Sequence, residues 1–249
     1  MSDVLTVLKR PTWWGLLLAL PFAMALCLVA ANWQWDRYER RSAEQQRADA
    51  VESTAPVPLN AALQPGQDSP ALAQFTPVTA TGTYDPQTIL IRNRSLDELR
   101  GMWVVSPLRL ADGGVVLVLR GWQEATRDNV QSPDLPSPPT GQVTVTGVLQ
   151  PSERKRGVGL LSNGEATTLN TETLCPDAAC YRAYVQLISS QPADTVTAVP
   201  VRGPGLGPHQ GYAGQWVIFA LMLPVGYVIL LRREIRETRA ARNPMTVSS

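Results

Sequence analysis

The sequence predicts a membrane protein in which two transmembrane helices flank an extracytoplasmic, β-rich domain of the α+β class, with a barrel-like or sandwich-like sheet. Three observations predict this fold. Two long apolar blocks without charge lie near the ends of the 249-residue chain. Between them, short β-type runs alternate with turn residues, and the chain contains 21 prolines and 18 glycines. A basic segment follows the second block, as is typical of the cytoplasmic end of a membrane helix.

The first apolar block runs from Trp13 to Ala31, and no charged residue occurs from Pro11 to Trp35. Because a helix rises ~1.5 Å per residue, a block of this length can cross a hydrocarbon layer of ~30 Å. We therefore expect a cytoplasmic N-terminus over 1–10 and a transmembrane helix over 11–35. A cleaved signal peptide is the alternative, but its apolar core is typically shorter, at about 7–15 residues.

The second apolar block, WVIFALMLPVGYVILL, extends from Trp216 to Leu231, and its uncharged helix can begin near Tyr212. We expect a transmembrane helix over 212–231. The following tail, 232–249, starts with RREIRETRAAR, in which five arginines outnumber two glutamates. The positive-inside rule places this tail in the cytoplasm. Two spans then put both termini in the cytoplasm and the segment 36–205 on the extracytoplasmic side.

The segment between the spans begins with polar helix formers, so we expect the first helix to continue to about Glu52. Asp112-Gly113-Gly114 predicts a hairpin turn, and the proline-rich stretch 132–140 predicts an irregular loop. Six or more antiparallel strands with one or two short helices would complete the domain. The β-type runs are FTPVTATGTY (75–84), TILIRNR (88–94), GMWVVSPLRL (101–110), GVVLVLRGW (114–122), QVTVTGVL (142–149), YVQLIS (184–189) and TVTAVPV (195–201).

The cysteines fit an extracytoplasmic domain. Cys175 and Cys180 are separated by four residues, and an oxidising compartment favours a local disulfide between them. Free thiols are the alternative. A metal site has weaker support, because two cysteines alone lack the remaining ligands and no histidine is near them in the sequence. Cys27 lies in the first apolar block, where we expect it to pack.

Charge and motif content exclude several function classes. The formal net charge is +1, from 22 basic and 21 acidic residues, so nothing favours a nucleic-acid partner. The sequence contains no Gly-x-Ser-x-Gly elbow and no phosphate-cradling glycine loop. Its single histidine, His209, stands at the membrane end of the chain. We therefore expect a protein that is not an enzyme.

His209 is the first candidate for binding chemistry. On a helix it shares one face with Tyr212, Ala213 and Trp216, at spacings of three, four and seven residues. A neutral imidazole flanked by aromatic rings at a membrane surface could ligate haem iron. An interfacial aromatic belt with an incidental histidine is the alternative, and chemistry alone favours it.

A second candidate lies at the outer end of the first span, where Trp33, Gln34 and Arg37 form Trp-Gln-x-x-Arg. Trp33 and Arg37 are four residues apart and share a helix face. Arg37 could pair with a carboxylate such as a haem propionate. The alternative is an arginine that extends to lipid headgroups, and the residues alone favour that interpretation.

Four motifs occur in order: Trp33-Gln34-x-x-Arg37, Gly101-x-x-Val-x-x-Pro107-Leu108, Val116–Trp122 ending in Arg-Gly-Trp, and His209-x-x-Tyr212-Ala213-x-x-Trp216. Together they resemble the surfeit locus protein 1 family (Surf-one/Shy-one) of cytochrome c oxidase assembly factors. The departures suggest a divergent bacterial branch. They are Ala31-Asn32 where the family has Gly before Trp-Gln, Pro208 where it has Asn, and Gln123-Glu124 where it has Val-Pro.

The resemblance implies a function in assembly rather than catalysis. It implies help in inserting haem A into the catalytic subunit of cytochrome c oxidase, with haem A as a transient cofactor and His209 as the iron ligand. Trp33, Gln34, Arg37, Tyr212 and Trp216 would surround the cofactor. The implied partners are that catalytic subunit, other oxidase or supercomplex subunits, a haem A synthase and the lipid bilayer. The implied location is the bacterial cell membrane, as a multi-pass protein.

Two other functions stay open. The chain could be a non-haem structural scaffold or accessory subunit of the oxidase or of a respiratory supercomplex. It could also be an extracytoplasmic enzyme anchored by two helices, which the missing catalytic motifs disfavour.

Overall fold

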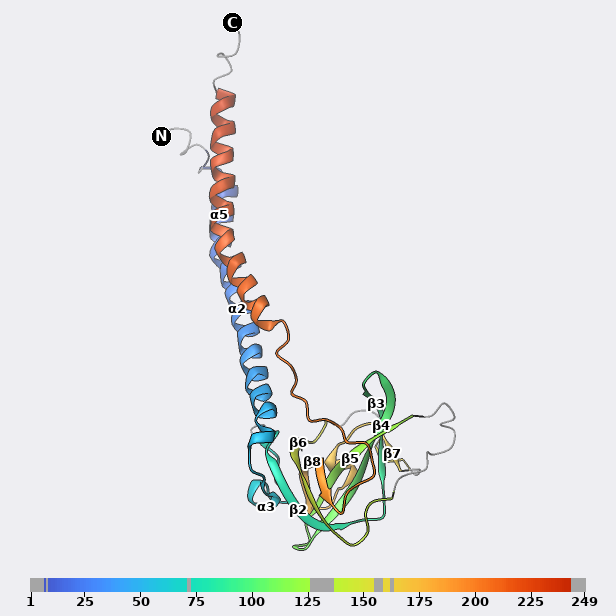
Figure 1. The fold of residues 1–249 in the computed structure, drawn as a ribbon. Helices are drawn as coiled ribbons and strands as arrows, with labels where there is room; N and C mark the ends of the chain where they lie inside the picture. Colours follow the sequence, from blue (N-terminus) through green and yellow to red (C-terminus); the bar gives the residue numbers. More distant parts are fainter. Residues whose placement is uncertain are drawn as a thin grey trace. The chain divides into compact units, whose positions relative to one another are not determined.

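The computed structural model describes residues 7, 9–70, 73–125, 137–154, 159–161 and 164–242. Contacts divide the chain into a helical unit, 1–43 with 205–249, and a β domain, 44–204. Most of the predicted loop 132–140 lies outside the described residues. The elements in chain order (Figure 1) are α2 (Pro11–Asp49), η1 (Val51–Ser53), β1 (Val57–Pro58), α3 (Leu59–Ala62), β2 (Pro77–Tyr84), β3 (Ile89–Leu96), β4 (Leu99–Leu110), β5 (Val115–Glu124), β6 (Gln142–Pro151), β7 (Glu165–Ala166), α4 (Thr171–Leu174), β8 (Cys180–Gln191) and α5 (His209–Arg242).

The helical unit is built from the two apolar blocks. Within it α2 and α5 are long and apolar enough to cross a membrane. Their apolar side chains are mostly exposed: Leu18 is 73 % exposed and Leu221 63 %. The core helix of a soluble protein would bury such residues, so this surface supports membrane association. As predicted from the polar residues after the first block, α2 continues beyond it, to Asp49.

The β domain is organised around a closed ring of strands. β2 pairs with β6, β6 with β8, β8 with β5, β5 with β4, and β4 returns to β2. The β5–β8 pair is parallel, whereas the other four pairs of the ring are antiparallel. The expectation of purely antiparallel strands was therefore wrong for β5–β8. The reason is geometric: strand direction cannot alternate all the way around a ring with an odd number of strands.

The central strand β5 explains why this ring is stable. Val116 and Val118 point into the barrel, where they pack with residues of β2, β4, β6 and β8. Leu117 and Leu119 point to the opposite face, where they pack beneath Leu169 and its neighbours. Since β5 is buried on both faces, its sequence is a nearly continuous apolar run rather than an alternating one.

Local sequence signals account for the connections between strands. The predicted hairpin is confirmed: Asp112, Gly113 and Gly114 connect β4 to β5, and Gly113 has a φ of +86°. The predicted strand TVTAVPV was wrong. Its segment forms only one isolated bridge, between Thr197 and Trp122, among the described residues. The peptide nitrogen of Pro200 cannot donate to a ladder, so a regular strand is disfavoured there.

Candidate functional site

The helices α2 and α5 pack antiparallel, and contacts at both ends fix their register. Near one end, Arg10 forms an ion pair with Glu234. The rings of Trp13 and Tyr227 meet edge to face there, with centroids 5.7 Å apart. Near the other end, at the start of α5, His209 contacts Gln34 of α2. The packing of α2 against α5 therefore brings together His209 and Gln34, which are 175 positions apart in the sequence.

The contact between His209 and Gln34 joins two of the residues singled out in the sequence. His209 Nδ1 lies 2.9 Å from Gln34 Oε1, and both side chains are half-buried. An amide oxygen can only accept, so this hydrogen bond requires the proton on Nδ1. The lone pair of the neutral imidazole then lies on Nε2. This is the arrangement in which a histidine ligates a metal, with its other nitrogen held by a neighbouring acceptor.

Gly207 packs closely against the Nε2 side of the ring, where a larger residue would be crowded. Its φ is +62°, a backbone conformation that favours glycine. A Cβ added to Gly207 would lie 3.4 Å from His209 Nε2 and 3.4 Å from Arg41 Nη1. The imidazole and the Arg41 guanidinium therefore both lie close to the backbone of Gly207. Sequence reasoning missed Arg41, although it stands seven residues after Gln34 and hence on the same face of α2.

Three of the other four candidate residues are more exposed. On α2, the Trp33 side chain is 58 % exposed, and Arg37 is exposed without an ion-pair partner among the residues described. On α5, Tyr212 is 47 % exposed. Trp216 is half-buried, and its ring meets Phe219 edge to face at 5.8 Å. Of the predicted set, the structure places only Gln34 in hydrogen-bonding contact with His209.

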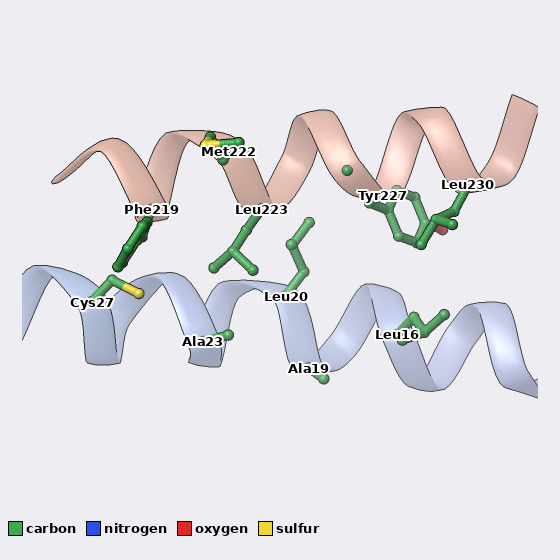
Figure 2. A pocket seen from close by; sticks show the side chains of 11 residues that line it. Leu16, Ala19, Leu20, Ala23, Cys27, Phe219, Met222, Leu223, Tyr227 and Leu230 are labelled. Atoms are coloured by element: carbon green, nitrogen blue, oxygen red, sulfur yellow. The ribbon is translucent and has the colours of Figure 1, made fainter. Parts of the chain in front are cut away.

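An apolar groove of about 550 Å³ runs between the two helices. In Figure 2 the side chains of Leu20 and Leu223 point towards one another across it. Small residues, Ala19 and Ala23 on α2 and Gly226 on α5, are part of its lining and leave room between the helices. Its nearest α5 residue, Phe219, follows His209 by ten positions, which is ~15 Å along a helix. The groove could hold a flexible apolar chain attached to a group at His209.

The β domain contains a buried ionic centre of a different kind. Arg120 of β5 is fully buried and donates to both carboxylate oxygens of Asp194, at 2.7 and 2.8 Å. Ser106 Oγ lies 3.4 Å from the same guanidinium, and the Tyr84 ring lies beneath it. Burial raises the pKa of Tyr84, with the Asp194 charge adding to this effect and Arg120 opposing it. The centre ties the segment after β8 to the end of the barrel.

The rest of the Arg-Gly-Trp motif also serves the fold. Trp122 Nε1 donates to the Arg94 carbonyl at 2.7 Å, and its backbone N–H donates to the Thr197 carbonyl at the same distance. A Cβ on Gly121 would overlap the Thr197 carbonyl. A Cβ on Gly101, which begins another motif, would overlap the Trp122 ring. Both glycines are therefore required by close packing.

The disulfide candidates and metal ligands can also be placed. Cys175 and Cys180 form a disulfide, with their Cα atoms 6.1 Å apart, at the start of β8. Within the described part of the chain, no group of three or more His, Cys, Asp or Glu side chains could hold a metal ion. His209 therefore offers one nitrogen ligand, which suits an iron already held by a porphyrin better than a bare ion.

Comparison with known proteins covers most of the chain. A family model described as the SURF1 family matches residues 21–221. Proteins of Mycobacterium tuberculosis and Mycobacterium bovis, both named uncharacterized SURF1-like proteins, are 33 % identical over 268 residues. The match covers 98 % of this chain and 94 % of each relative. A SURF1-like protein of Dictyostelium discoideum is 31 % identical over 101 residues, covering 38 % of this chain and 37 % of that protein.

Proposed function

The chain belongs to the SURF1 family of oxidase assembly factors, and on this premise we propose that it assists the insertion of haem A into the catalytic subunit of a cytochrome c oxidase. One observation carries the proposal. The hydrogen bond between His209 Nδ1 and Gln34 Oε1 holds the imidazole at the junction of α2 and α5 and leaves Nε2 as the ring nitrogen that can bind a metal. The single histidine of the chain is thus prepared to act as a ligand.

The residues present fit a haem of this type. His209 would supply the iron ligand, and Gln34 would hold the imidazole in the required orientation. The groove between α2 and α5 would take the farnesyl tail, because its lining is almost entirely apolar. Trp33, Arg37, Tyr212 and Trp216 would form the wider surroundings. When bound in the oxidase, haem A supplies the redox chemistry; this chain would hold and release it.

The membrane arrangement follows from the same proposal. Both helices would cross the bacterial cell membrane, with both termini in the cytoplasm and the β domain on the extracytoplasmic side. The arginine-rich end of α5 supports this orientation. Catalytic-subunit helices, other oxidase or supercomplex subunits and a haem A synthase would meet the chain within the bilayer. The exposed apolar side chains of α2 and α5 offer surface for such contacts.

The first experiment measures haem per mole of full-length protein purified from cells that make haem A. We expect wild type to contain haem and His209→Ala to lose most of it, with an unchanged amount of protein in the membrane. Gln34→Leu should weaken retention about 10–100-fold, the range found when the partner of a metal ligand is removed. Gln210→Ala, an exposed neighbour, is the matched control.

The outcomes separate the two functions. If His209→Ala keeps the wild-type haem content, this histidine is not the ligand. If the wild type carries no haem, the chain is better described as a non-haem scaffold or accessory subunit. Stoichiometric co-purification with mature oxidase would then support that second function.

A further inference from the structure

The C-terminal part of α5 carries a hollow that combines apolar and cationic side chains. The hollow has a volume of about 500 Å³, and among the described residues it is lined by Ile229, Arg232, Ile235 and Arg236. Spacings of three and four residues place these side chains on one face of the helix. Ile229 belongs to the apolar block that ends at Leu231, whereas both arginines lie beyond it. The hollow therefore spans the change from apolar to cationic surface.

The charges of this hollow have no partner in the described part of the chain. Neither of its arginines forms an ion pair with a described residue, and both side chains are exposed. The acidic side chains of the same stretch are used elsewhere. Glu234 forms an ion pair with Arg10 of α2, and Glu237 accepts a hydrogen bond from Arg233 Nε at 2.8 Å. The hollow thus keeps two positive charges that no described carboxylate binds.

The position of these charges indicates the kind of anion that fits. In a helix that crosses a bilayer, the end of the apolar block lies at the depth of the lipid headgroups. A guanidinium can donate two parallel hydrogen bonds to phosphate oxygens. The isoleucines of the lining give apolar contact to the first carbons of an acyl chain, and a free phosphate ion would gain nothing from them. The lining therefore favours a lipid over a soluble anion.

We propose that the hollow at Arg232 and Arg236 binds the headgroup phosphate of an anionic phospholipid, with an acyl chain of this lipid against Ile229. The inference rests on the membrane arrangement proposed above and is independent of haem. The bound lipid holds α5 at a fixed depth in the bilayer. It does so near the end of the helix pair where Arg10 and Glu234 join α2 to α5.

The test is native mass spectrometry of the full chain in detergent, titrated with phosphatidylglycerol or with phosphatidylcholine, whose headgroup has no net charge. Wild type should bind one phosphatidylglycerol more tightly than phosphatidylcholine. Arg232→Gln and Arg236→Gln should each weaken phosphatidylglycerol binding about fivefold, because each removes one arginine from an anionic headgroup. Arg233→Gln is the matched control. It removes the same charge from the adjacent position, but Arg233 does not line the hollow, so wild-type binding should be kept.

Four results would overturn the inference. If wild type binds both lipids equally, the hollow does not select an anionic headgroup, while the haem content of the same preparation still tests the proposed function. If Arg233→Gln weakens binding as much as Arg232→Gln does, the effect comes from the total charge of the helix end. If inorganic phosphate at the lipid concentration displaces phosphatidylglycerol from wild type, the ligand is a soluble anion. If the chain is absent from carbonate-washed membranes, the membrane arrangement fails, and this inference fails with it.

Discussion

The β domain and the helical unit use their polar side chains in opposite ways. In the domain, Arg120 is bound on two atoms by Asp194, and the indole of Trp122 donates to a carbonyl. In the helical unit, Arg41 forms no ion pair with a described residue, and His209 is held by one hydrogen bond, from Nδ1 to Gln34. The difference teaches that the motifs of this chain are of two kinds. Arg-Gly-Trp completes the fold, whereas the histidine of the second motif makes one hydrogen bond across two helices and keeps a ring nitrogen, Nε2, for which no bond to a described residue is present.

The largest expected effect tests the Arg-Gly-Trp motif, which we assign a structural role. Arg120→Ala would leave the buried Asp194 carboxylate, in the segment after β8, without its ion-pair partner, which typically costs about 3–5 kcal/mol of unfolding free energy. Thermal denaturation of the purified full chain in detergent measures this loss. His209→Ala, by the same measurement, should change little, because the ring is at a helix end and half-buried.

Arg92 is the control for this substitution, because it is also an arginine in an ion pair of the β domain but is much more exposed. The Arg92 side chain is 47 % exposed, and it pairs with Glu165 at 3.5 Å. Arg92→Ala should therefore cost at most about 1 kcal/mol. Equal stability of Arg120→Ala and wild type would show that the buried pair is not structural. Arg120 would then have to be considered as part of a site.

The next effect concerns the disulfide at the start of β8. Cys175→Ser combined with Cys180→Ser should lower stability by about 2–3 kcal/mol, a modest amount because the closed loop is short. Alkylation mass spectrometry without reductant, on protein from the native membrane, reports the state of the pair. Cys27→Ser, in α2, is the control and should not alter the domain. Full labelling of both domain thiols would instead show a reduced pair.

Local patterns in the sequence predict much of this fold, and distant contacts explain what they miss. The apolar blocks predict α2 and α5, and the run GVVLVLRGW predicts the strand β5, which the structure shows to be buried on both faces. The parallel β5–β8 pair depends on ring closure between β2 and β4, which no local pattern encodes. Asp194 likewise meets Arg120 across 74 positions, directly before the segment that was predicted as a strand.

The candidate site shows the same division. Helical spacing placed His209 on one face with Tyr212 and Trp216, and the Trp-Gln-x-x-Arg motif pointed to Gln34 at the outer end of the first span. It could not show that the two helices meet with these residues in contact, because that register depends on packing along their whole length. Arg41 carried one usable signal, its spacing of seven from Gln34. Without knowledge of the facing helix, that spacing did not distinguish it from Arg37, which is three residues from Gln34.

The smallest expected effect concerns Tyr84, whose hydroxyl is buried without a hydrogen-bond partner among the described residues. Replacing it by phenylalanine keeps the ring beneath Arg120 and removes an unsatisfied group, so Tyr84→Phe should change stability at neutral pH by less than about 1 kcal/mol. The same hydroxyl makes the stability depend on pH, because burial raises the pKa of Tyr84 above its ordinary value of 10.0. At alkaline pH the folded state then retains a proton that the unfolded state loses. The contribution of Tyr84 to the free energy of unfolding is thus complete below about pH 10, and above that pH it falls by up to about 1.4 kcal/mol per pH unit. Denaturation measured across this range should show a shallower alkaline loss for Tyr84→Phe than for wild type. Identical slopes would mean that the hydroxyl reaches solvent, and that the domain is less closed around Arg120 than its contacts indicate.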